Sequence, residues 1–115
     1  VEGMPLAALH AGVDASWSTF GEYLDRLDGN LGVNAAFLVG HCALRRYVMG
    51  EAGTGNEATP EQVEAMKAEL HAALAAGALG FSSSQSFTHN DGEGHPIPSR
   101  SATTECGRAR SRRDA

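Results

Sequence analysis

The fold of this chain is decided by the stretch TPEQVEAMKAELHAALAAGALGFS, which runs from Thr59 to Ser82. Its first four residues place a capping threonine, a proline at the first helical position and a glutamine at the capping-box position. Apolar residues then recur at helical spacing and form one expected buried stripe, made of Val63, Met66, Leu70 and Leu74. Gly77 is the expected stop. The residues directly after it, 78–82, are expected to form a short strand.

A second apolar run precedes this helix at residues 33–40. It is mostly apolar without strict alternation, which is typical of a strand buried on both faces, as in parallel sheets. Strand, helix and strand in this order predict a βαβ unit. A further amphipathic helix is expected from about Ser16 to Leu27, because Thr19 and Glu22 have capping-box spacing and Gly29 can end it.

The loop lengths favour particular α/β architectures. The helix reaches the second strand almost at once, whereas about twenty residues follow the first strand and a long polar loop follows the second, from Ser83 to about Ala102. Long loops at the carboxyl ends of strands are typical of (β/α) barrel enzymes. An open doubly wound sheet would give a similar pattern, so spacing leaves both architectures open.

Charge and composition exclude several classes of protein. The formal net charge is −5, and the acidic residues lie almost entirely within residues 1–106, which argues against nucleic acid as the main partner. No apolar run approaches the length that a bilayer span requires, so no membrane partner is expected. The two cysteines are too few for a disulfide framework, which favours a reducing compartment and a cytoplasmic location.

Several stretches, in unbroken order, resemble the N-acyl-D-amino-acid deacylase (D-aminoacylase) branch of the amidohydrolase superfamily. They are residues 1–6 (VEGMPL), 17–24 (WSTFGEYL), 39–45 (VGHCALR), 48–50 (VMG), 58–61 (ATPE), 77–84 (GALGFSSS), 98–100 (PSR) and 102–105 (ATTE). The resemblance implies that residues 1–105 are part of a (β/α)8 metal-dependent hydrolase barrel, about two strands and their helices. The complete chain of such an enzyme is several times longer.

The resemblance also implies an activity. Enzymes of this family hydrolyse the amide bond of small-molecule N-acyl-D-amino acids, a carbon–nitrogen bond other than a peptide bond, with a zinc-activated water. Their zinc ligands are an early His-x-His pair, a cysteine, two later histidines and a late aspartate, and none of these maps onto this sequence. We therefore expect the chain to be an internal fragment without metal ligands or catalytic residues of its own, inactive when alone.

Residues 106–115 do not match the family and carry four arginines. Residues 102–105 have the pattern of a helix N-terminus, but no apolar stripe follows them. We therefore expect a disordered tail that arises from a change of reading frame near Cys106. An arginine-rich arm that binds nucleic acid is the alternative interpretation.

Four residues are candidates either for contact with a substrate or for holding neighbouring residues of a site in position. His41 and Arg45 follow the first strand, and Ser83 and Gln85 follow the second, so all four are expected at the same rim. Histidine suits hydrogen bonding, and arginine suits a carboxylate. No Gly-x-Ser-x-Gly elbow surrounds the serines, which argues against a serine nucleophile.

Two other groups are interpreted as structural. Cys42 is read as a small buried residue, and residues 89–95 (HNDGEGH) as a turn, since their spacing matches no zinc or EF-hand signature. The alternative to the enzyme fragment is a small non-catalytic α/β protein that binds a ligand or partner through its polar loops.

Overall fold

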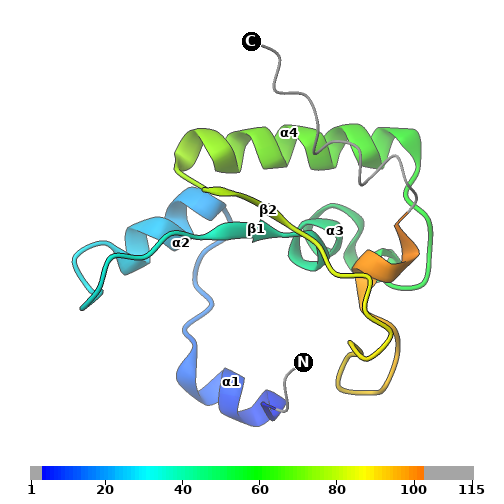
Figure 1. The fold of residues 1–115 in the computed structure, drawn as a ribbon, viewed down its shortest axis with the longest axis horizontal. Coiled ribbons are helices and arrows are strands. Elements are labelled where there is room, and N and C mark those ends of the chain that lie inside the picture. Colours follow the sequence, from blue (N-terminus) through cyan, green and yellow to red (C-terminus); the bar gives the residue numbers. More distant parts are fainter. Residues whose placement is uncertain (1–3, 103–115) are drawn as a thin grey trace.

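The computed structural model describes residues 4–102, which form helices around a two-stranded sheet (Figure 1). In chain order the elements are α1 (Leu6–Gly12), α2 (Phe20–Leu27), β1 (Leu38–Gly40), α3 (His41–Met49), the 3₁₀ helix η1 (Gly50–Gly53), α4 (Pro60–Ala76), β2 (Gly80–Ser82) and the 3₁₀ helix η2 (Pro98–Ser101).

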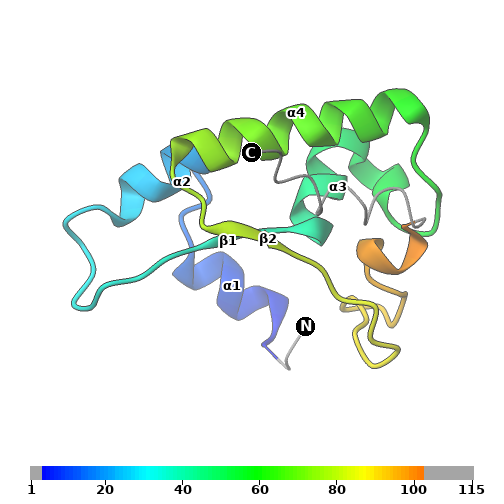
Figure 2. The same ribbon diagram turned by 45° about the horizontal axis from the view of Figure 1, so that its top comes forward.

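The expected βαβ unit is confirmed. β1 and β2 pair in parallel, with Leu38 opposite Gly80, Val39 opposite Phe81 and Gly40 opposite Ser82. Parallel neighbours need a crossover connection, which here contains α3, η1 and α4, and α4 lies across one face of the sheet (Figure 2). The described chain therefore combines helices with two parallel strands, whereas the (β/α)8 barrel stays a prediction.

α4 begins and ends where its sequence predicts. The Thr59 side chain accepts a hydrogen bond from the Gln62 N–H, and the Gln62 side chain returns one to the Thr59 N–H, which completes the capping box. At the other end Gly77 adopts φ 118°, a left-handed conformation that residues with a Cβ avoid. The chain then turns into β2 within three residues.

The buried face of α4 is rotated from the predicted stripe. Met66, Leu70 and Ala73 are its buried residues, Val63 is half-buried, and Leu74 is 40% exposed. The core that they join contains Val39, Leu44, Met49 and Ala78. The prediction for Leu74 was wrong because no other described element covers that side of the helix.

β1 is shorter than the predicted strand at residues 33–40. Only residues 38–40 pair with β2, Val39 alone is buried, and Leu38 is 50% exposed. Burial on both faces was therefore wrong for the described chain, since Val39 is the only residue of β1 that joins the core. Leu79 extends the pairing by donating its N–H to the Phe37 carbonyl at 2.8 Å.

The predicted first helix is present as α2, with its capping box at Thr19 and Glu22. It begins at Phe20 rather than near Ser16, because Thr19 is its N-cap. α2 packs on α4 so closely that a Cβ placed on Gly21 would lie 3.6 Å from the Ala76 Cβ.

Two helices were not predicted. α3 runs for nine residues and begins with no loop after β1. α1, whose leucines and alanines favour helix, has no buried residue. The polar loop after β2 contains η2 and an isolated antiparallel bridge between Asn90 and Pro96.

The predictions for the tail, residues 106–115, and for the helix entrance at 103–105 lie outside the described residues. No helix within residues 4–102 is both long and apolar enough to cross a membrane.

The rotation of α4 gives a testable difference between two leucines on the same helix. Replacing Leu70 by alanine is expected to lower the free energy of unfolding by about 2–5 kcal/mol, because it leaves a cavity in the core. Leu74→Ala, the matched control, is expected to cost about 1 kcal/mol or less. Urea denaturation followed by circular dichroism measures both, and equal losses would contradict the observed burial.

Candidate functional site

Polar side chains gather where β1 and β2 end. β1 leads directly into α3, so the first residue of the helix, His41, lies beside the end of β2. Its Nδ1 atom is 2.8 Å from the Ser83 Oγ atom, within hydrogen-bond distance. Two of the four candidate residues from the sequence are thus in direct contact across the parallel pair.

The environment of His41 keeps its ring neutral at pH 7. The side chain is only 3% exposed, and its ring centroid lies 5.2 Å from that of Phe81. Burial lowers the pKa of His41 from 6.5 to about 4, and the positive charge of Arg45 adds to the shift. Neutral imidazole has one nitrogen that accepts a hydrogen bond, so it can act as acceptor or base.

Arg45 is a fully buried residue that organises the chain after α3. Its Nε donates to the Gly53 carbonyl at 3.3 Å, and its Nη2 donates to the Asn56 carbonyl at 2.6 Å. Gly53 lies so close that a Cβ there would be 3.1 Å from the Arg45 carbonyl oxygen. Within the described residues the buried Nη1 has no hydrogen-bond partner. These contacts give Arg45 a structural role, and contact with a substrate carboxylate stays a prediction.

Gln85 and Ser99 fix the loop that follows β2. The Gln85 Nε2 donates to the Ser99 carbonyl at 2.9 Å, and the Ser99 Oγ donates to the Ser84 carbonyl at 2.6 Å. The Cys42 thiol donates to the same Oγ at 3.3 Å. Ser99 is completely buried, so it joins the loop to α3. Sequence reasoning missed it as a site residue, although it lies in the matched stretch 98–100.

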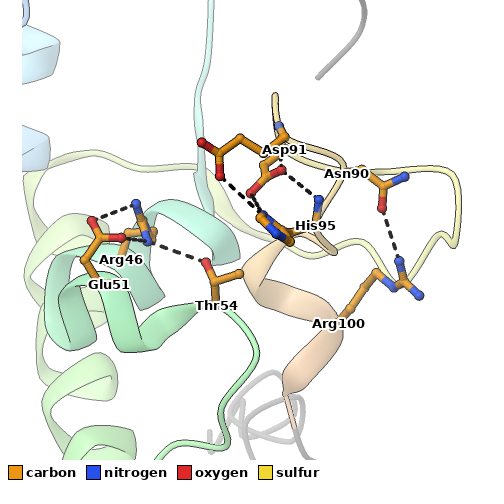
Figure 3. A network of polar contacts seen from close by, with 8 residues as sticks. Arg46, Glu51, Thr54, Asn90, Asp91, His95 and Arg100 are labelled. Atoms are coloured by element: carbon orange, nitrogen blue, oxygen red, sulfur yellow. Dashed lines mark hydrogen bonds and ion pairs between the residues drawn. The ribbon is translucent and has the colours of Figure 1, made fainter.

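An open pocket of about 1090 Å³ lies in front of this cluster. Residues at the start of α3, at the end of β2 and in the loop after β2 line it, and His41 and Ser83 are among them. Figure 3 shows two pairs of contacting side chains that line this pocket. On one side Arg46 pairs with Glu51 at 3.1 Å, and on the other His95 contacts Asp91 at 3.3 Å.

Residues 89–95 form a turn, as the sequence predicts. One carboxylate oxygen of Asp91 accepts the backbone N–H groups of Glu93 and His95, at 2.9 and 2.8 Å. Both bonds lower the pKa of Asp91, and the bond from the His95 N–H has the larger effect. His89 lies at hydrogen-bond distance, 3.0 Å, from the Ser84 Oγ.

The described residues do not fit a zinc site. Within residues 4–102, no group of three or more histidine, cysteine, aspartate or glutamate side chains could hold a metal ion. The pocket can therefore supply hydrogen bonds, charge and a neutral imidazole, but no convergent ligand set.

The lowered pKa of His41 makes the fold sensitive to acid. The unfolded chain binds a proton on His41 below about pH 6.5, whereas the folded chain resists it until about pH 4. Stability from this residue is thus complete above pH 6.5 and falls by about 3 kcal/mol between pH 7 and pH 4. Denaturation at a series of pH values measures this loss, and a His41→Gln control should reduce the slope between pH 6.5 and 4.5. An equal slope in both proteins would contradict the assignment.

Comparison with known proteins identifies one similar enzyme. Over 79 residues the chain is 39% identical to a D-aminoacylase from Alcaligenes xylosoxydans xylosoxydans. The match covers 68% of this chain and 16% of that enzyme. No protein-family model matches the sequence, and no solved structure matches it. The chain is therefore similar to one short part of a D-aminoacylase.

Proposed function

We propose that this chain is part of a metal-dependent hydrolase that cleaves the amide bond of N-acyl-D-amino acids or related N-acyl compounds. The observation that carries the proposal is the 39% identity over 79 residues to a D-aminoacylase. Because the match covers 16% of that enzyme, the remaining length would hold the zinc ligands and the catalytic groups.

The fold supports a position inside a larger α/β barrel. β1, α4 and β2 have the order and parallel pairing of one barrel repeat. Parallel sheets are normally covered on both faces, whereas here α4 lies over one face of the pair, and α1, on the opposite side in Figure 2, has no buried residue. In a barrel, further strands would pair with both edges of this sheet and enclose its other face.

The pocket supports a place on the substrate side of such an enzyme. Active sites of (β/α) barrels lie at the carboxyl ends of the strands, and His41 and Ser83 occupy that end of β1 and β2. In this proposal the Ser83 hydroxyl forms a hydrogen bond with the polar part of an N-acyl amino acid. His41, Gln85 and Arg45 hold the surrounding loops in place.

The coding DNA on both sides of this chain tests the proposal. An upstream frame should encode a His-x-His pair. Downstream, a shift of one or two bases near Cys106 should restore an amphipathic helix that leads to a strand ending in histidine. If no frame on either side encodes these features, the proposal fails, and the small non-catalytic binding protein becomes the better interpretation.

An activity assay gives a second test. We expect the 115-residue chain to leave N-acetyl-D-methionine unhydrolysed with and without added zinc, because activation of water requires about three or four convergent ligands. Turnover that disappears in His41→Ala would contradict this expectation and would place the reacting centre within this chain.

A further inference from the structure

Ser83 and His41 form a hydroxyl–imidazole pair that opens into the pocket. The Oγ and Nδ1 atoms are 2.8 Å apart, and both residues line the 1090 Å³ space. Ser83 is exposed, whereas His41 is almost fully buried. A serine in contact with a base and with solvent is the first requirement of a nucleophile.

The charges around His41 keep the imidazole unprotonated. Arg45 lies one turn further along α3, and Lys67 of α4 lines the same small void as His41 while pairing with Glu64 at 2.6 Å. On the loop after β2, His89 contacts Ser84, and Asp91, Glu93 and His95 line the same pocket as His41. Burial and the positive charge of Arg45 favour the neutral ring, which accepts a proton from a neighbouring group but holds it weakly.

The start of α3 provides a place for negative charge. No described side chain caps its first turn, and residues 40–43 line the pocket beside Ser83. Backbone N–H groups at a helix start stabilise an oxyanion that forms next to them.

Although no Gly-x-Ser-x-Gly elbow surrounds Ser83, its contact with His41 leads us to propose that Ser83 is a nucleophile that takes an acyl group from small activated esters, with His41 as its base. The Ser83 oxygen forms a bond to the carbonyl carbon, and its proton passes to the His41 Nδ1. The bond from that carbon to the leaving oxygen breaks, the leaving group departs with the electron pair, and His41 releases its proton to water. The product is an ester on Ser83, and this activity is independent of the proposed amide hydrolysis.

The ester on Ser83 accumulates. An activated leaving group departs with little help, but attack of water on a serine ester depends on a strong base. A weakly basic His41 therefore supports formation of the Ser83 ester better than its hydrolysis.

Acetylation with p-nitrophenyl acetate tests the proposal on the full chain. Intact mass and peptide mapping should place one stable acetyl group on Ser83, formed at least about tenfold faster than on any other serine. Ser83→Ala should remove it, and the matched control Ser86→Ala, in the same loop, should retain it. Acetyl groups spread evenly over the serines would overturn the proposal.

The pH dependence tests the role of His41 without a substitution in the core. The rate of Ser83 acetylation should change less than about twofold between pH 8 and pH 5.5, because His41 remains neutral over this range. A base with an ordinary histidine pKa would lose about tenfold over the same range, and that result would overturn the assignment of His41. Circular dichroism at both pH values establishes that the fold is unchanged. His41→Gln should lower the rate about 10- to 100-fold where that variant remains folded.

Discussion

The parallel pairing of β1 with β2 is the constraint on which the rest of this structure depends. Parallel strands cannot be joined by a tight turn, so the chain must return through α4, and α4 then brings the core to one face of the sheet. The same pairing places the two carboxyl ends side by side. His41 meets Ser83 because both follow directly on paired residues, Gly40 and Ser82.

Signals confined to a few neighbouring residues were readable in the sequence. The ends of α4 follow from Thr59, Gln62 and Gly77, whose effects act within one helical turn. The face that α4 buries was predicted less well, because the position of Leu74 depends on which elements pack nearby. The length of β1 likewise depends on another element, because only the residues that pair with β2 form the strand.

The candidate site shows the same division between local and long-range information. The position of His41 and Ser83 at the carboxyl ends of the strands follows from strand order, so their proximity was predictable, whereas their role in a site stays a prediction. The burial of Arg45 and the central role of Ser99 depend on contacts with distant segments: Arg45 binds carbonyls of the loop before α4, and Ser99 bonds to residues 15 and 57 positions away. No spacing rule in the sequence encodes those contacts.

The two-stranded sheet has a consequence for handling the protein. Within the described chain, the outer edges of β1 and β2 have no strand partner, and Leu38 and Leu79 beside them are 50% and 71% exposed. Unpaired backbone groups flanked by apolar side chains recruit strands from other molecules. At high protein concentration we expect such edges to promote edge-to-edge aggregation. Natural sheets prevent such pairing with a lysine or a proline on the edge strand.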